Sequence, residues 1–357
     1  MKKHRQFFLV FAALLSFTFA SQSAWAKTYR ITIGSGYNLD LYEIHSMWKN
    51  DILVNIQKRV KTETGHEIEF VGAWAGAIAK VGEELEAVES GILKMGLVIT
   101  PAESSKLFLN NFGYKIPFGS RDSEAGSWVN LTMYRKNKIL QDIFKRYNQK
   151  WLAVISYEAY DVITTFPFKT MADLKSKKIG ALGANIPWLK NTGAVAVQSN
   201  TAEAYMSLQT GVIDGFMLPL SYAYGPKLYE VAKYATSVGI SVPAGPCWTI
   251  NLDLWNSMPP KVQEIFVEEA DRYNEAVPAL VAKLKREGDG KLQEKGVTFF
   301  SLSDEERGKW LMLVKDMAKD FVREANERGL PGKQLAQSYI EESERSGYTW
   351  PIKYELD

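Results

Sequence analysis

Cysteine and histidine are scarce in this chain of 357 residues, which holds one cysteine and three histidines. The single cysteine, Cys247, excludes an internal disulfide, and its apolar neighbours Pro246 and Trp248 predict a buried, inert thiol. After residue 26 only His45 and His66 remain, and neither has acids or cysteine at metal-ligand spacing. We therefore expect no metal and no cofactor.

Signatures of enzymes are missing as well, because the sequence has no Gly-x-Ser-x-Gly elbow and no phosphate-binding loop. Pairs of acids that could act in catalysis occur in any sequence, so a periplasmic enzyme stays an alternative. The expectation is nevertheless a protein that is not an enzyme.

Long apolar runs are confined to the N-terminus. Lys2, Lys3 and Arg5 precede the apolar run 7–20, and Ala24-Trp25-Ala26 has small residues where a signal peptidase needs them. We predict a signal peptide over residues 1–26, cleavage after Ala26 and a periplasmic mature chain. The run is short for an uncleaved membrane anchor, and no cysteine follows the site to carry a lipid. The mature chain is expected to have no stable membrane insertion.

An excess of one charge is also lacking. Removal of residues 1–26, which hold three basic and no acidic residues, changes the formal charge from +2 to −1. A nearly neutral surface gives no support for binding of nucleic acid or of anionic membranes.

Two stretches share an order of helix, glycine and apolar strand. In the segment 200–219, Asn200 and Glu203 form a capping-box pattern, Gly211 ends the predicted helix, and Val212 and Ile213 predict a short strand before Asp214-Gly215. The segment 84–97 has the same order. Two similar lobes would explain this recurrence, although such joints are common in any α/β protein. A loop at the carboxyl end of a strand is where open α/β sheets bind ligands.

Alternation and helical spacing predict an α/β chain. Residues 29–33 and 66–71 are predicted strands, each followed by a glycine-containing loop and a helix. Further predictions are one helix over 123–147, a strand over 151–156, a strand near 238–242, a long helix over 258–295 that Pro278 should kink, and a helix over 303–328.

The order of these motifs resembles the extracytoplasmic solute-binding subunits of TRAP transporters, the DctP-type family. The resemblance covers residues 27 to about 330. The motifs that carry it are, in chain order, Glu86-Ala87-Val88 to Gly91, Pro117-Phe118, Asp173-Leu174-Lys175 with Lys178-Ile179, Gly193-Ala194, Glu203 to Pro219, and Trp255 to Gln263. It implies a two-lobed, periplasmic-binding-protein-like α/β fold with a hinge and a long helix spanning both lobes. It also implies capture of a small organic ligand for the TRAP membrane subunits, with a sensor kinase as an alternative partner. We expect residues 27–156 and 247–285 to form lobe I, and 157–246 and 286–357 to form lobe II.

Three positions depart from the pattern of family members that bind carboxylates. Gly180 stands where the resemblance implies an arginine, the loop 157–162 has no arginine, and Leu218 replaces a frequent polar residue. An arginine fork binds a carboxylate in a way that glycine and leucine cannot reproduce. A simple carboxylate is therefore disfavoured, and an amine or cation, or a neutral aromatic or apolar solute, is expected instead.

The candidate ligand-binding residues are aromatic, acidic or apolar residues in loops near predicted strand ends. They are Trp74, Tyr157, Glu158, Tyr160, Asp161, Trp188, Phe216, Leu218, Tyr222 and Trp248. Each aromatic could instead fill the core, and the two acids could be solvated loop charges. Tyr157 and Tyr160 have opposite parity after a strand end, so only one of them is expected to face inward.

Overall fold

The computed structural model describes residues 26–357 and contains two β-sheets. The predicted signal peptide and its apolar run lie almost entirely outside the described residues.

The first sheet has the order β2-β1-β3-β10-β4 and forms the centre of lobe I. Its strands are β1 (Thr28–Gly34), β2 (Glu67–Ala73), β3 (Met95–Val98), β4 (Gln149–Ser156) and β10 (Ala244–Asn251). β1 runs parallel to β2 and β3, whereas β10 is antiparallel to both of its neighbours. β10 is buried at every position because it lies inside the sheet with both faces covered.

The second sheet has the order β11-β9-β5-β8-β6-β7 and forms the centre of lobe II. Its strands are β5 (Asp161–Thr164), β6 (Lys178–Ala181), β7 (Val195–Gln198), β8 (Gly215–Leu218), β9 (Tyr234–Ser237) and β11 (Thr298–Ser301). The α/β prediction is confirmed, and the two helix-glycine-strand units fall in different sheets, ending in β3 and β8. Gly91 and Gly211 both have positive φ, at 76° and 69°, which suits glycine after a helix.

Short helical segments connect the strands of each sheet. Those before β5 are η1 (Leu39–Leu41), α1 (Glu43–Met47), a π-helical turn η2 (Trp48–Ile52), α2 (Leu53–Thr64), α3 (Glu84–Glu89), η3 (Leu109–Asn111), α4 (Phe112–Lys115), α5 (Ser123–Lys136), α6 (Ile139–Asp142) and η4 (Ile143–Tyr147). Between β5 and β9 lie η5 (Met171–Leu174), η6 (Gly183–Leu189), α7 (Thr201–Gln209), η7 (Leu220–Ala223) and η8 (Leu228–Glu230).

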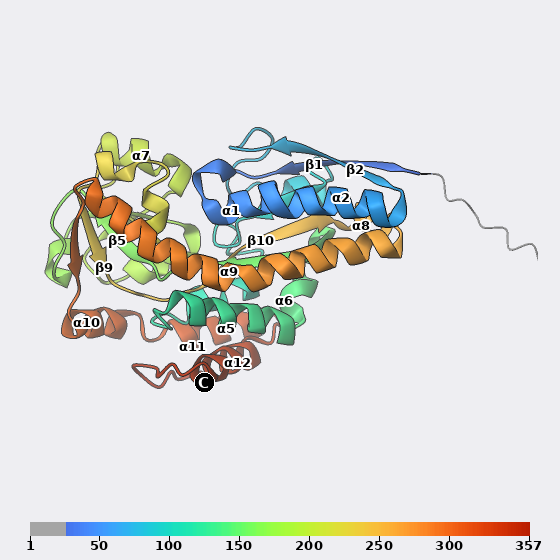
Figure 1. The fold of residues 1–357 in the computed structure, drawn as a ribbon. Helices are drawn as coiled ribbons and strands as arrows, with labels where there is room; N and C mark the ends of the chain where they lie inside the picture. Colours follow the sequence, from blue (N-terminus) through green and yellow to red (C-terminus); the bar gives the residue numbers. More distant parts are fainter. Residues whose placement is uncertain (1–25) are drawn as a thin grey trace, which may run out of the picture.

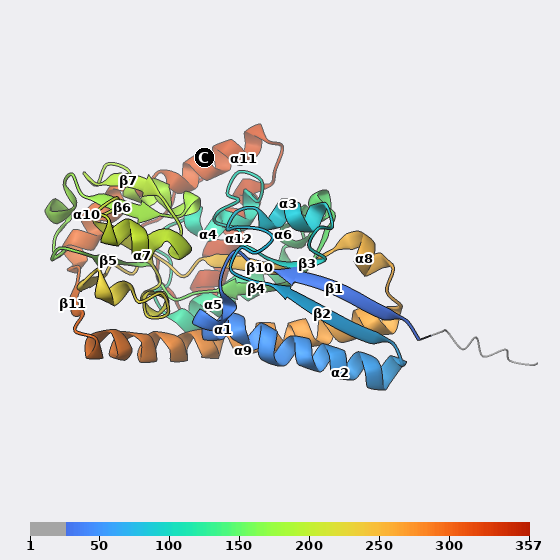
Figure 2. The same cartoon turned by 90° about the horizontal axis from the view of Figure 1, so that it is seen from above.

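The long helix α9 (Pro260–Glu294) follows α8 (Leu252–Asn256) and runs along both sheets (Figures 1 and 2). It packs against α2, α5 and β4 of lobe I, and against η7 of lobe II. Pro278 is buried inside this helix and does not end it. The chain therefore passes between the lobes at three places: from β4 to β5, from β9 to β10, and along α9.

The C-terminal helices α10 (Asp304–Val314), α11 (Met317–Glu327) and α12 (Gly332–Arg345) follow β11. α10 contacts η5 of lobe II, while α11 and α12 pack on α4 and α5, which precede β4 of lobe I in the chain. Segment 304–345 thus contacts η5 of lobe II and also α4 and α5, whose chain leads into β4 of lobe I.

Four local predictions are wrong. The strand expected at Val212 and Ile213 begins only at Gly215, because Asp214 accepts a hydrogen bond from the Lys178 amide at 2.8 Å and turns the chain there. The helix expected over 123–147 ends at Lys136, since the Asn137 side chain donates to the Met133 carbonyl.

The strand expected near 238–242 is the passage from β9 to β10 rather than a strand. The helix expected over 303–328 is interrupted at Lys315 and Asp316, between α10 and α11.

Candidate functional site

Loops at strand ends of the two sheets meet in a closed interface between the lobes. The Ala184 amide of lobe II donates to the Pro101 carbonyl of lobe I at 3.0 Å. The Tyr42 ring of lobe I stacks on the Tyr222 ring of lobe II, with ring centres 4.5 Å apart and planes 17° apart. A Cβ on Gly225 would lie 2.5 Å from the Leu41 carbonyl oxygen, so this glycine permits a close approach of the two backbones at this point.

An aromatic cluster around His45 fills part of this interface, and we call it the His45 cluster: Tyr37, Tyr42, His45, Tyr157 and Tyr222. His45 Nε2 lies 3.1 Å from the Tyr157 hydroxyl and 3.5 Å from the Tyr222 hydroxyl. Burial lowers the pKa of His45 to about 3, because a charged imidazolium is poorly solvated there. The histidine is therefore neutral at physiological pH and acts as a hydrogen-bonding aromatic group.

A second aromatic group lies where η6 meets α4. The Tyr114 and Tyr160 hydroxyls are 3.1 Å apart, and Trp188 donates its Nε1–H to the Tyr114 carbonyl at 2.7 Å. Trp188 also stacks on the Tyr114 ring and meets Tyr160 edge-on. Burial raises the pKa values of both tyrosines, so their hydroxyls stay neutral. Tyr157 and Tyr160 are both buried and lie in different clusters, so the expectation that only one of them faces inward is wrong.

Cavities formed by residues of both lobes open into the interface. One has a volume of about 340 Å³ and is lined by Val81, Gly82 and Ala102 of lobe I and by Leu182, Gly183, Gln198, Ser199, Asn200 and Glu203 of lobe II. None of these nine lining residues is lysine or arginine. Another, about 260 Å³, lies between Asp40 to Ser46, the η7 region and Lys291 of α9.

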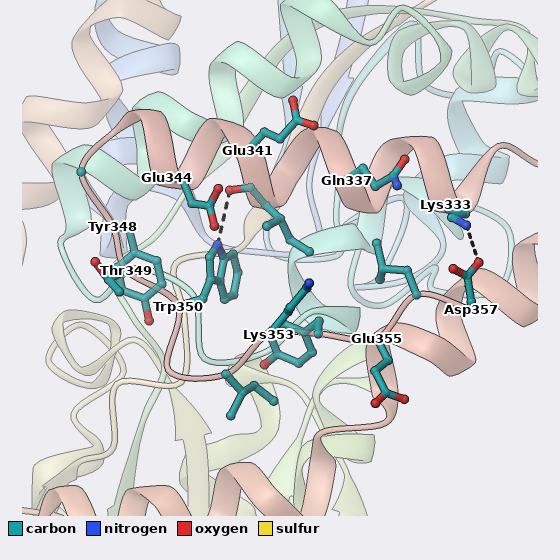
Figure 3. A pocket seen from close by; sticks show the side chains of 15 residues that line it. Lys333, Gln337, Glu341, Glu344, Tyr348, Thr349, Trp350, Lys353, Glu355 and Asp357 are labelled. Carbon is teal, nitrogen blue, oxygen red and sulfur yellow. Dashed lines mark hydrogen bonds and ion pairs between the residues drawn. The ribbon is translucent and has the colours of Figure 1, made fainter.

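A larger cavity, about 1320 Å³, lies away from this interface. Figure 3 shows the residues that line it. It is formed by α12 and the segment after it, where Lys333 pairs with Asp357 and Trp350 Nε1 donates to the Ile340 carbonyl at 3.3 Å. All its lining residues come from 333–357, and none belongs to a loop at a strand end. Position therefore favours the interface as the ligand site.

The two candidate acids make contacts at the passages between the lobes. Glu158 Oε1 accepts a hydrogen bond from the Ser221 amide at 2.5 Å, and Asp161 Oδ1 accepts from the amides of Val238 and Gly239 at 2.7 and 2.8 Å. Burial raises the pKa of Glu158 to about 7, which the nearby Lys285 ammonium opposes. Glu158 thereby connects the β4–β5 passage to η7, and Asp161 connects it to the β9–β10 passage.

The other candidates lie in or beside the core. Trp248 stacks on Trp48 with ring centres 4.8 Å apart, inside lobe I. Phe216 and Leu218 are buried in β8, and Trp74 is half-buried beside the lobe I core.

Gly180 is a glycine for a packing reason. It pairs with Phe216 in the neighbouring strand, and a Cβ at residue 180 would lie 2.7 Å from Phe216 Cδ2 and 2.9 Å from Ile213 Cδ1. The phenyl ring occupies the space that a longer side chain would need.

Sequence reasoning did not select Tyr37, Tyr42, His45, Tyr114 or Asn185, which all lie at or next to the interface. Tyr37 stood in a predicted strand-end loop, and that position was the only available signal. The sequence gives His45 no signal beyond its being a possible metal ligand, and residues 26–357 contain no cluster of three or more metal-ligating side chains. None of the helices in this range is long and apolar enough to cross a membrane.

Residues 44–325 match the family described as bacterial extracellular solute-binding protein, family 7, or DctP. The chain belongs to this family. The DctP-type resemblance is thereby confirmed, and so is the expectation of a two-lobed fold.

Individual relatives agree with this assignment. The chain is 28% identical over 246 residues to the C4-dicarboxylate-binding periplasmic protein DctP of Rhodobacter capsulatus, covering 64% of this chain and 68% of that protein. Its fold is similar to a TRAP solute-binding protein of Rhodoferax ferrireducens T118 in complex with copurified benzoate, with a TM-score of 0.77, 18% identity and coverage of 89% and 98%.

A TRAP periplasmic solute-binding protein of Haemophilus influenzae RdAW with bound L-gulonate has a TM-score of 0.76 at 18% identity, covering 88% of this chain and 99% of that one. DctP-family proteins are receptors for small ligands.

Proposed function

We propose that this chain is the extracytoplasmic receptor of a TRAP-type transporter and that its ligand is a small, uncharged organic molecule with an aromatic or apolar body. The ligand would bind between the lobes, next to the two aromatic clusters and the 340 Å³ cavity. The observation that carries this proposal is the absence of lysine and arginine from the nine residues that line that cavity.

A cationic ligand has less support than an uncharged one. Glu158 and Asp161, the acids selected from the sequence, accept hydrogen bonds from backbone amides and lie near Lys285. Burial raises the pKa of both carboxyls, that of Glu158 to about 7, so the negative charge that would attract a cation is disfavoured there. Aromatic faces remain available to a cation, so an amine is the second candidate.

A carboxylate is the third candidate, because several similar solved structures contain a bound carboxylate. Benzoate is bound by the Rhodoferax ferrireducens protein and L-gulonate by the Haemophilus influenzae protein. Both share only 18% of their residues with this chain, so the similarity concerns the fold. Here Gly180 packs under Phe216, which leaves no space for a basic side chain at that position.

Matched probes test the ligand class. The mature chain 27–357 is screened by thermal shift with benzamide, benzoate and benzylamine, which have similar size and differ in charge at neutral pH. Cyclohexanecarboxamide, cyclohexanecarboxylate and cyclohexylmethylamine form a second, non-aromatic set. Binding to the native state raises Tm, and we expect only the carboxamides to do so. A larger shift with either carboxylate, or with either amine, overturns the proposed class.

The transport role requires lobe closure, delivery and export. Hinge closure predicts a more compact scattering profile with ligand than without it, and identical profiles would exclude it.

Uptake should require the TRAP membrane subunits, whereas dependence on a sensor kinase alone would support the receptor alternative. N-terminal sequencing of the exported protein should begin at Lys27 if Ala26 precedes the cleavage site.

A further inference from the structure

Asn185 is a buried side chain without hydrogen-bond partners. It is fully buried, and neither its Nδ2 nor its Oδ1 has a partner within residues 26–357. Most buried polar atoms in folded proteins are hydrogen-bonded, since an unpaired one keeps its desolvation penalty. Two unpaired atoms on one amide therefore call for a specific explanation.

The position of Asn185 in η6 places it at the lobe interface. Its neighbour Ala184 donates to the Pro101 carbonyl of lobe I. η6 is a 3₁₀-helix, in which side chains three residues apart lie on the same face. Asn185 thus shares a face with Trp188, which contacts the Tyr114 and Tyr160 rings. The unpaired amide is on the helix face that meets these aromatic residues.

A second unpaired polar atom lies at the adjacent strand end. Ser199 directly follows β7, which pairs in parallel with β6, the strand before η6. The Ser199 amide donates to the Ala181 carbonyl at 3.0 Å, while its Oγ has no partner within the described residues. Ser199 also lines the 340 Å³ cavity. The carboxyl ends of β6 and β7 therefore present unpaired polar atoms at the interface, where α/β sheets place ligands.

We propose that Asn185 is a ligand-binding residue that recognises an uncharged head group carrying both a hydrogen-bond donor and an acceptor, such as a carboxamide or lactam. A carboxamide side chain presents an N–H donor beside a carbonyl acceptor. A carboxylate would satisfy only Nδ2 and face Oδ1 with like partial charge, and an ammonium would satisfy only Oδ1. An amide-like group satisfies both atoms at once. This inference rests on the proposed function, which it refines from an uncharged solute to one with an amide-like head group.

The test compares benzamide with acetophenone, which keeps the carbonyl acceptor and replaces the NH₂ donor by a methyl group. Dissociation constants are measured by calorimetry for the wild-type mature chain and for Asn185→Leu, together with the Tm of each ligand-free protein. One neutral hydrogen bond corresponds to a benzamide preference of roughly 2- to 12-fold in the wild type. Leucine has a similar volume and no polar atoms, so Asn185→Leu should abolish this preference and leave the ligand-free Tm equal or higher.

Asn110→Leu is the matched control, because Asn110 is equally buried but its Nδ2 donates to the Tyr134 hydroxyl at 2.9 Å and to the Leu140 carbonyl at 2.8 Å. This variant should lower Tm and keep the benzamide preference. Should its preference vanish as well, the loss in Asn185→Leu would not be specific and the inference would fail.

Failure of the inference and failure of the proposed function give different results. An Asn185→Leu protein that still prefers benzamide, or that loses Tm as Asn110→Leu does, overturns the role of Asn185 while benzamide binding continues to support an uncharged ligand. A wild-type chain that binds benzoate or benzylamine and neither uncharged probe overturns the proposed ligand class, and the role of Asn185 with it.

Discussion

Replacement of Gly180 by alanine tests the packing that separates this chain from the expected carboxylate-binding pattern. The new Cβ would lie 2.7 Å from Phe216 Cδ2 and 2.9 Å from Ile213 Cδ1, whereas ordinary van der Waals contacts begin at about 3.4 Å. Both neighbours are buried, so the overlap must be relieved by moving core side chains or the strand. Overpacking of this kind costs about 1–3 kcal/mol, which corresponds to a Tm decrease of roughly 2–6 °C if each kcal/mol lowers Tm by about 2 °C in a chain of this size.

The assay is thermal and urea unfolding of wild type and Gly180→Ala, with Gly290→Ala as control. Gly290 lies inside α9, and apart from its own helical backbone no atom lies within 4 Å of its Cβ position, so alanine there should stabilise the helix by up to about 1 kcal/mol. The double variant Gly180→Ala with Phe216→Leu should be less destabilised than the sum of its single variants, because the smaller side chain makes room. Wild-type stability of Gly180→Ala, or strict additivity in the double variant, would refute the packing argument.

Three further outcomes are expected. Gly225→Ala places a Cβ 2.5 Å from the Leu41 carbonyl oxygen of the other lobe, so it should weaken ligand binding and give a more open scattering profile with little change in Tm; unchanged affinity would contradict closure at this contact. Burial raises the pKa of Glu84 from 4.5 to about 8, so its contribution to stability is present below about pH 4.5 and is lost as the pH rises through 8. Glu84→Gln should therefore flatten the pH dependence of urea unfolding in that range, and an unchanged slope would show that Glu84 is not responsible. Cys247 is buried and its thiol pKa is raised to about 12, so a disulfide reagent should label it only after unfolding; fast labelling of the native protein would disagree.

Patterns along the chain were sufficient for the fold class because local signals and burial agree there. Helical spacing of apolar residues from Val262 to Leu280 predicts the long helix, and α9 spans Pro260–Glu294. Two of the four wrong predictions of secondary structure concern single polar residues. Asn137 ends α5 and Asp214 delays β8 through side-chain hydrogen bonds to the backbone, and such bonds leave no periodic trace in a sequence.

Loops at predicted strand ends were a useful guide to the candidate site. The direction in which each side chain points could not be predicted from the sequence. Tyr157 and Tyr222 lie together at the interface beside His45, while Trp248 stacks on Trp48 inside lobe I. Tyr157, Tyr222 and Trp248 are all candidates selected near predicted strand ends. Which neighbour each ring meets depends on strand register and on the path of the passages between lobes.

The sequence by itself determined the α/β class, the long helix, the family and the near-neutral charge of residues 27–357, because these properties follow from composition, periodicity and motif order. Only the tertiary structure decided that Glu158 and Asp161 bind backbone amides, that Phe216 fills the space beside Gly180, and that Asn185 is buried without partners. These three facts depend on which residues, distant in the chain, are brought within a few ångströms of each other. Such contacts form when the two sheets pack together and the chain crosses between the lobes at three places, and no local sequence pattern predicts them.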